Sequence, residues 1–321
     1  MKAVAYHAYG SPDVLHLEEV PEPVPGDTEV LVRVRAAAVN SWDWEYVQGT
    51  PLVNRIGGLR HPRHPILGAD VAGTVEAVGK RVVRLRPGDA VYGDLSGCGW
   101  GGFAEYVCAD EDALARKPVA VSYEEAAAVP QAGVLALQAL RDVARLRPGE
   151  RVLVNGAGGG AGTFAVALAN LLGASVTGVD SAEKQDLMRS LGVERAMDYA
   201  QQDYTRTGER YDVIVDMQAY RRPCDYARAL RPAGRFVAVG GSGATLLAVV
   251  AAAPVVRLTQ GKRLALLLHR PKRADLEYLG ALLDAGVLAP AIDRRFALAD
   301  TPQAVRYFSE GHAQGKVVIT V

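Results

Sequence analysis

The sequence is poor in the residues that build disulfide frameworks and metal clusters. Only three of its 321 residues are cysteines, Cys98, Cys108 and Cys224, and none belongs to a C-x-x-C pair. This pattern offers no zinc cluster and favours a reducing compartment. Net charge is also absent, because 36 Lys and Arg residues balance 36 Asp and Glu residues. The whole chain therefore gives no electrostatic reason to bind nucleic acid or an anionic membrane.

Long apolar segments are missing as well. The first residues lack the apolar core of a signal peptide, and the longest apolar run, residues 244–256, is shorter than a membrane span and contains Pro254. We interpret this run as a buried helix or an interface segment. We expect a cytoplasmic globular protein, and the length suggests two domains.

Glycine, in contrast, is concentrated at one place. Residues 156–162 contain five glycines, between the β-branched run Val152–Asn155 and the apolar run Phe164–Leu172. Such a strand, glycine turn and helix let a pyrophosphate approach the backbone and lie at the helix N-terminus. The spacing Gly156-x-x-Gly159-x-x-Gly162 departs from the strict G-x-G-x-x-G pattern, but its context predicts a dinucleotide-binding loop that also includes Gly160.

The arrangement of elements predicts an α/β fold with a second, β-rich domain. Up to about Val121, short alternating strands are separated by Pro and Gly, which is typical of an irregular barrel or sandwich. From about Ser122, apolar strands alternate with helices, as in a doubly wound parallel sheet. The last run, Lys316–Val321, is a strand that we expect to rejoin the first domain.

An acidic residue ends the second strand of the predicted nucleotide half. Asp180 follows Val176–Val179, where a ribose-binding acid belongs and where it favours NAD. Ser181 and Lys184 lie beside it and could instead bind a 2′-phosphate by a hydroxyl and a point charge. Lys184 could equally be an exposed residue in a first helical turn, and spacing alone does not decide between the two.

The first domain offers several polar candidates. Asn40 follows a strand and is framed by tryptophans, so it could line a flat aromatic pocket or merely sit in a turn. Tyr92 could donate a hydrogen bond, although many tyrosines do so structurally. His61 and His64 are separated by proline and have no cysteine nearby, which favours a surface loop over a metal site.

Five motifs occur in one order along the chain: Gly68–Gly79, Gly88–Gly93, Gly101–Val107, the glycine loop and Gly315–Thr320. This order resembles the medium-chain dehydrogenase/reductase superfamily, in its zinc-independent quinone oxidoreductase-like branch. The resemblance runs essentially from end to end. It implies a GroES-like catalytic domain over residues 1–121, completed by about 285–321, and a Rossmann dinucleotide-binding domain over residues 122–284.

The resemblance also bears on metal. Zinc alcohol dehydrogenases of the superfamily have a cysteine at the position of Asn40 and a histidine at that of Ala69, and both ligands are missing. The four-cysteine lobe of their structural zinc is missing too. The resemblance therefore implies catalysis without zinc.

For the cofactor, the resemblance implies NADPH. Quinone oxidoreductases hold the 2′-phosphate with a lysine at the position of Lys184 and a tyrosine at that of Tyr199, and both residues are present. Asp180 departs from the small neutral residue of many relatives, so use of NADH stays open. Gly240 and Lys316, together with Asn40, complete the set of expected cofactor-binding residues.

The resemblance implies hydride transfer from the nicotinamide to a quinone or an α,β-unsaturated carbonyl, in a homodimer. Asn40 is expected to position nicotinamide or substrate, and Tyr46, Tyr92 and Gln131 are candidates for donating to the carbonyl oxygen. Two departures concern the substrate side: Leu135 replaces a threonine, and Asp216–Tyr220 replaces a glycine-containing turn. They leave open a non-catalytic, redox-sensing NADPH binder, and an alcohol dehydrogenase-like oxidoreductase is the other alternative.

Overall fold

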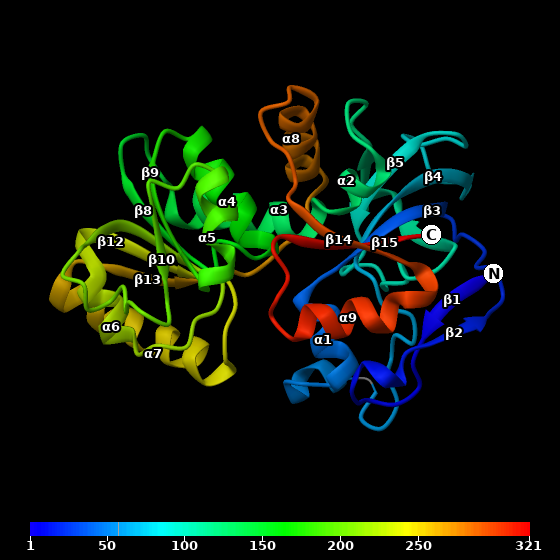
Figure 1. Ribbon diagram of the computed structural model, residues 1–321. Coiled ribbons are helices and arrows are strands. Elements are labelled where there is room, and N and C mark those ends of the chain that lie inside the picture. The colour runs from blue at the N-terminus through cyan, green and yellow to red at the C-terminus, as the bar shows by residue number, and fades with distance from the viewer. Residues whose placement is uncertain (57) are drawn as a thin grey trace. The chain divides into compact units, whose positions relative to one another are not determined.

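The computed structural model describes residues 1–56 and 58–321 and divides into two compact units. Unit 1 comprises residues 1–131 and 271–321, and unit 2 comprises residues 132–270. The predicted fold class is confirmed, because one unit is β-rich and the other is a parallel sheet with helices (Figure 1).

Unit 1 is built around a seven-stranded sheet in the order β14-β15-β3-β4-β5-β7 with β6 paired to β3. Its strands are β3 (Glu29–Val39), β4 (Asp70–Val78), β5 (Ala90–Asp94), β6 (Tyr106–Asp110), β7 (Leu114–Arg116), β14 (Ile292–Ala297) and β15 (Lys316–Thr320). A separate hairpin pairs β1 (Lys2–Ala5) with β2 (His16–Glu19). Its helices are α1 (Ser41–Gln48), α2 (Tyr123–Ala127), α8 (Arg273–Asp284) and α9 (Thr301–Ser309), with short 3-10 turns at Pro12–Val14, Leu52–Arg55, Glu111–Ala113 and Leu298–Asp300.

Strand β3 is long enough to change partners along its length. Residues 29–33 pair with β6, and residues 36–39 pair with β15. The predicted return of the C-terminal strand to the first domain is therefore confirmed. Its pairing places Lys316 next to the end of β3, where Asn40 caps the N-terminus of α1.

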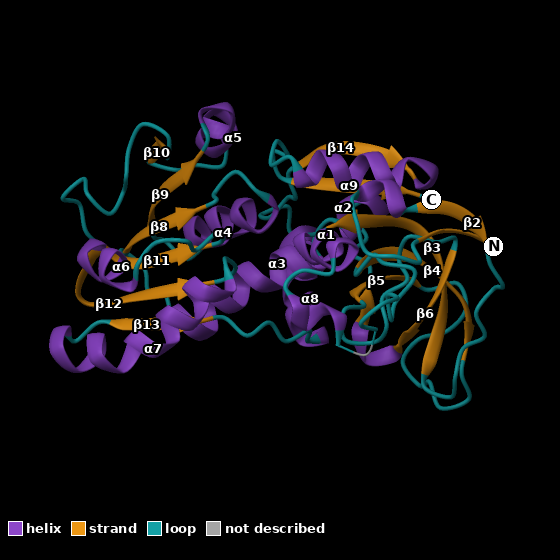
Figure 2. Ribbon diagram, turned by 90° about the horizontal axis from the view of Figure 1, so that it is seen from below, coloured by secondary structure: helices purple, strands orange, loops and turns teal. Residues whose placement is uncertain are grey.

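Unit 2 is a six-stranded parallel sheet in the order β10-β9-β8-β11-β12-β13, which Figure 2 shows strand by strand. The strands are β8 (Arg151–Asn155), β9 (Ser175–Asp180), β10 (Arg195–Asp198), β11 (Tyr211–Asp216), β12 (Leu230–Ala238) and β13 (Arg263–Leu266). The helices are α4 (Gly160–Leu171), α5 (Gln185–Ser190), α6 (Pro223–Ala229) and α7 (Gly243–Gln260), with a 3-10 turn at Ala182–Lys184. Helix α3 (Pro130–Leu137) continues as a π-helical segment, Gln138–Ala144.

The unit boundaries differ from the predicted domain boundaries at 121/122 and 284/285. Helix α2 packs on β3 and β4, and α8 packs on β7, so both belong to unit 1. The backbone N–H of Ala120 also donates to Asp284 at the end of α8, at 3.0 Å. The resemblance implies that both helices belong to the Rossmann domain, whereas their packing places them in unit 1.

Helix α7 also differs from expectation. Only Val249 and Val256 are buried, so the expectation of a buried helix is wrong. The helix is 18 residues long and, by length and composition alone, long and apolar enough to cross a membrane. It packs on β13 and α6 within unit 2 and leaves an apolar face exposed.

Candidate functional site

The glycine loop joins β8 to α4 in a conformation that only glycine allows at two positions. Gly156 has a φ of +81°, in the left-handed region. A Cβ at Gly162 would overlap the carbonyl oxygen of Gly156. Gly159 caps α4 and Gly160 begins it, so the first-turn N–H groups of α4 are offered to an anion. The loop therefore fits a dinucleotide pyrophosphate.

Asp180 ties this loop to the end of β9. Its Oδ2 accepts a hydrogen bond from the backbone N–H of Gly158 at 2.9 Å, and its Oδ1 accepts one from that of Ser181 at 2.9 Å. Lys184 Nζ lies 3.6 Å from Oδ1, and both side chains are about nine-tenths buried. The carboxylate is thus engaged by the loop and by the lysine at once.

Lys184 is not the exposed residue that one alternative foresaw. It is 8% exposed, and its stem lies over the loop so closely that a Cβ at Gly158 would come within 2.6 Å of Lys184 Cβ. The alternative of an exposed structural lysine is therefore wrong. The ammonium group is held at the end of β9, beside the glycine loop.

Tyr199 reaches the same place through strand pairing. Asp198 is the register partner of Asp180, and the backbone N–H of Tyr199 donates to the carbonyl oxygen of Asp180 at 3.1 Å. The Tyr199 side chain is 51% exposed. The structure thus brings Asp180, Ser181, Lys184 and Tyr199 together, with a tyrosine accessible to a ligand and a lysine close beneath the surface.

Asp216 explains how the turn after β11 forms without glycine. It is 1% exposed, and its Oδ1 accepts from Asn155 Nδ2 at 2.7 Å and from the backbone N–H of Gln218 at 3.0 Å. Burial is the largest cause of the raised pKa of Asp216. Gly240 accepts from the N–H of Ala219 at 2.9 Å, so it holds the other side of this turn. The anchoring role of Asp216 was not foreseen, although an acid at a strand end is a visible signal.

In unit 1, Asn40 lies in a buried polar cluster. Its Nδ2 donates to Asp70 Oδ2 at 3.0 Å and, at 3.5 Å, to the carbonyl oxygen of Ala38, while its Oδ1 accepts from Lys316 Nζ at 2.5 Å. Its backbone N–H donates to Asp43 Oδ2 at 2.7 Å. The Asn40 amide is therefore hydrogen-bonded within this cluster, and its expected contact with nicotinamide or substrate stays a prediction.

Two acids and one lysine form the charged centre of this cluster. Lys316 Nζ lies 3.2 Å from Asp70 Oδ2, and Asp43 accepts the backbone N–H of Gly68 at 2.9 Å. Asp43 and Asp70 are fully buried and Lys316 is 2% exposed. Burial raises the pKa of Asp43 to about 7, and it raises the pKa of Asp70 to about 6 although Lys316 acts in the opposite direction. Lys316, which was expected to bind cofactor, pairs with Asp70 and Asn40 in this cluster.

Gln131 joins the cluster through its backbone. Its N–H donates to Asp70 Oδ1 at 2.9 Å, and the residue is 2% exposed. Its Nε2 atom is buried, and it has no hydrogen-bond partner among the residues that the structure describes.

The two tyrosine candidates differ in their surroundings. Tyr92 is fully buried, and its hydroxyl donates to the carbonyl oxygen of Leu276 in α8 at 2.5 Å, which is a structural role. Tyr46 is partly exposed and lies in an aromatic group, with its ring centroid 4.8 Å from that of Trp100 and 6.5 Å from that of His64. Burial raises the pKa of Tyr46, so its phenol is a neutral donor.

The residues at the family's zinc positions do not fit that metal. Zinc in proteins is bound by thiolate, imidazole and carboxylate groups, and neither Asn40 nor Ala69 supplies any of these. Over residues 1–56 and 58–321, no group of three or more His, Cys, Asp or Glu side chains is arranged to hold a metal ion. We derive no chemical step through zinc.

Comparison with known proteins gives two family matches. Residues 26–119 match the alcohol dehydrogenase GroES-like domain, and residues 191–319 match the zinc-binding dehydrogenase family. The name of the second family refers to zinc, but in this chain Asn40 and Ala69 occupy the positions of two zinc ligands.

Individual relatives match along the whole length. The chain is 32% identical to the chloroplastic quinone-oxidoreductase QR1 of Triphysaria versicolor, covering 99% of this chain and 98% of the relative. It is also 32% identical to the chloroplastic NADPH-dependent alkenal/one oxidoreductase of Arabidopsis thaliana, covering 99% and 79%. The solved quinone oxidoreductase of Coxiella burnetii superposes with a TM-score of 0.90 at 30% identity, covering 100% and 99%. The chain therefore belongs to the medium-chain dehydrogenase/reductase superfamily, in its quinone oxidoreductase-like branch.

Proposed function

We propose that the chain is a zinc-independent, NADPH-dependent reductase of quinones or α,β-unsaturated carbonyls. The observation that carries the proposal is the grouping of Lys184 and Tyr199 at the end of β9, beside a glycine loop fitted to a pyrophosphate. Relatives named quinone oxidoreductase and alkenal/one oxidoreductase support the substrate class. Neither the non-catalytic nor the alcohol dehydrogenase-like alternative is favoured by these relatives.

In this proposal the chain's own residues bind and orient the cofactor and the substrate, and the bound reduced nicotinamide would supply the hydride. The first-turn amides of α4 bind the pyrophosphate, and Lys184 with Tyr199 binds the adenosine 2′-phosphate. Asp180 holds Lys184 beside the loop rather than repelling that phosphate, because its charge is already compensated by the lysine and two backbone N–H groups. Among the candidates for the substrate oxygen, Tyr46 and Gln131 keep a donor for a ligand.

The reductase activity is tested by mixing the chain with NADPH and either a quinone or an enone, and following the loss of nicotinamide absorbance. We expect turnover that a chelator does not affect. Tight NADPH binding without turnover over a broad panel of acceptors would exclude the enzyme. Oxidation of saturated alcohols that a chelator abolishes would overturn the zinc-free proposal.

The cofactor assignment is tested with Lys184→Ala. Loss of one charge-assisted contact is worth about 1.5–3 kcal/mol, so NADPH affinity should fall by roughly tenfold or more. The variant also leaves Asp180 without its lysine, 3.6 Å away in the wild type, which adds repulsion toward the 2′-phosphate. NADH affinity should change little, and equal losses for the two cofactors would refute the assignment.

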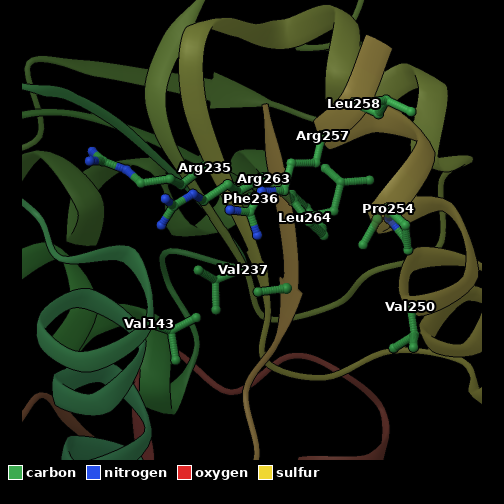
Figure 3. Close-up of a pocket in the computed structure, with 12 residues that line it drawn as sticks. Val143, Arg235, Phe236, Val237, Val250, Pro254, Arg257, Leu258, Arg263 and Leu264 are labelled. Atoms are coloured by element: carbon green, nitrogen blue, oxygen red, sulfur yellow. The ribbon is translucent and has the colours of Figure 1, made fainter. Parts of the chain in front are cut away.

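The expected homodimer has a candidate contact surface in unit 2. Leu247, Val255 and Leu258 lie on the outer face of α7 and are 70%, 62% and 89% exposed. Beside α7, a groove of about 780 Å³ is bordered by β12 and the edge strand β13, and its lining side chains are drawn in Figure 3. An edge strand beside a wide apolar helix face is a surface that a second copy can cover symmetrically.

Sedimentation of two matched variants tests the dimer. Leu258→Glu should shift the wild-type dimer to monomer, because it places a charge on the apolar face of α7 at its most exposed leucine. Val24→Glu, at a position in unit 1 that is 87% exposed, should leave the dimer unchanged. A monomeric wild type, or equal behaviour of the two variants, would contradict this surface.

A further inference from the structure

The side-chain amide of Gln131 carries a donor that no residue in the described part of the chain accepts. Its Nε2 atom is buried and has no hydrogen-bond partner among the described residues, and the residue as a whole is 2% exposed. Leaving an amide donor unsatisfied in a protein interior is costly, and native structures do so rarely. A buried, unpaired donor of this kind therefore indicates an acceptor that arrives with a ligand.

The backbone around this donor is fixed from two sides. Gln131 is the second residue of α3, after Pro130, and its N–H donates to Asp70 Oδ1 at 2.9 Å. The other oxygen of Asp70 is held by Asn40 and Lys316, at 3.0 and 3.2 Å. A donor whose main chain is anchored to such a network needs little reorganisation when an acceptor binds.

A second glutamine on the same helical segment shows that burial alone does not leave a glutamine amide unpaired here. Gln138 is 3% exposed, its Nε2 donates to the carbonyl oxygen of Arg270 at 2.7 Å, and its Oε1 accepts from the N–H of Arg270 at 3.3 Å. Both glutamines are equally buried, yet the polar atoms of Gln138 are satisfied within unit 2. Gln138 is therefore a matched control for the substitution of Gln131.

The chemistry of the surrounding residues points to a carbonyl oxygen. Asp70 directly follows Ala69, and it accepts hydrogen bonds from the Asn40 amide and from the backbone N–H of Gln131. Through Asp70, Gln131 therefore adjoins the two positions that lack zinc ligands. Without a Lewis acid, negative charge that develops on the substrate oxygen requires a hydrogen-bond donor. The amides and hydroxyls of Asn40 and Tyr92 are already used.

We propose that Gln131 is a catalytic residue whose Nε2 binds the carbonyl oxygen of the quinone or enone, an inference that rests on the proposed reductase function. When hydride from NADPH adds to the β-carbon of an enone, the carbon–carbon π pair shifts and the oxygen becomes an enolate oxygen. The Nε2–H group stabilises that charge by a hydrogen bond and keeps its proton, because a carboxamide is a very weak acid. Water then protonates the α-carbon, so one NADPH and one proton yield NADP⁺ and the saturated carbonyl compound.

The test compares Gln131→Met with Gln138→Met in the full chain. Gln131→Met keeps the side-chain volume and should lower kcat for quinone and enone by about 100-fold, as loss of an oxyanion donor does. Its thermal midpoint should equal or exceed that of the wild type, because no hydrogen bond is lost, and NADPH affinity should stay within about twofold. Gln138→Met should show the reverse, with a lowered midpoint and nearly unchanged kcat.

A second variant guards against a folding defect. In Gln131→Glu the shape is kept while the donor becomes an ionisable carboxyl, so kcat should be low at high pH and rise as the carboxyl takes up a proton and can donate again. Turnover by Gln131→Met within about threefold of wild type would overturn the inference and leave the reductase proposal standing. A parallel fall in NADPH affinity would also overturn it, by assigning Nε2 to the cofactor. A wild-type chain that binds NADPH but reduces neither acceptor would refute the reductase proposal itself.

Discussion

Replacing Lys316 by methionine tests whether the buried cluster of unit 1 depends on its single cation. The ammonium lies 3.2 Å from Asp70 Oδ2, and with an effective dielectric constant of about 20 the Coulomb energy at that distance is about 5 kcal/mol. Breaking a buried pair by removing one partner typically costs about 3–5 kcal/mol, because the other charge stays buried. We therefore expect Lys316→Met to lower the free energy of unfolding of unit 1 by about 3–5 kcal/mol at pH 8.

The chain contains a control with the same distance and different burial. Lys80 Nζ also lies 3.2 Å from a carboxylate oxygen, that of Asp27, but the two side chains are 77% and 53% exposed. Exposed pairs are worth about 0.2–1 kcal/mol, so Lys80→Met should have little effect. Chemical denaturation of both variants measures the difference.

The pH dependence sharpens this experiment. Burial raises the pKa of Asp70 to about 6 even beside Lys316, so removal of the lysine raises it further. At about pH 5 the orphaned carboxyl then takes up a proton, and the loss caused by Lys316→Met should shrink. Equal effects of Lys316→Met and Lys80→Met at pH 8 would refute the account of the cluster as a desolvated ion pair.

Three further predictions concern other parts of the chain. Gly162→Ala should abolish NADPH binding, since its Cβ would overlap the loop carbonyl, whereas Gly243→Ala, with open space around it, should bind normally; isothermal titration separates them. Because burial raises the pKa of Asp43 to about 7, its contribution to stability is full below the ordinary carboxyl pKa of about 4 and is lost as pH rises to about 7, so Asp43→Asn should flatten the decline in unfolding free energy between about pH 4 and pH 7. Tyr92→Phe should lower stability by about 1 kcal/mol through loss of the bond to Leu276 and leave kcat unchanged; a fall in kcat without a fall in stability would restore Tyr92 as a donor to substrate.

The sequence pattern predicts the fold well because its signals are local. The glycine loop, the alternation of strands and helices after Ser122, and the acid at the end of β9 all lie within short stretches, and each is where the pattern places it. The strand Lys316–Thr320 is also recognisable from its β-branched residues. What local patterns do not decide is which unit a short helix packs against, as α2 and α8 show.

The candidate site is less predictable, because it is assembled from distant residues. Asn40 looks like a free amide in the sequence, and only the fold brings Lys316, 276 positions later, onto its oxygen. Tyr92 likewise looks like an available phenol, and only the fold shows that its hydroxyl donates to the carbonyl oxygen of Leu276. The unpaired state of Gln131 Nε2 is visible only after every neighbour has been placed.

The pairing of β15 with the second half of β3 has a consequence for the order in which the protein forms. Unit 2 is one continuous segment, residues 132–270, but unit 1 needs residues from both sides of it. During synthesis all strands of the Rossmann sheet are made before β15, so Asp70 is made long before Lys316, its partner in the buried ion pair. Unit 1 therefore completes its sheet, and its buried Lys316–Asp70 pair, only after all of unit 2 has been synthesised.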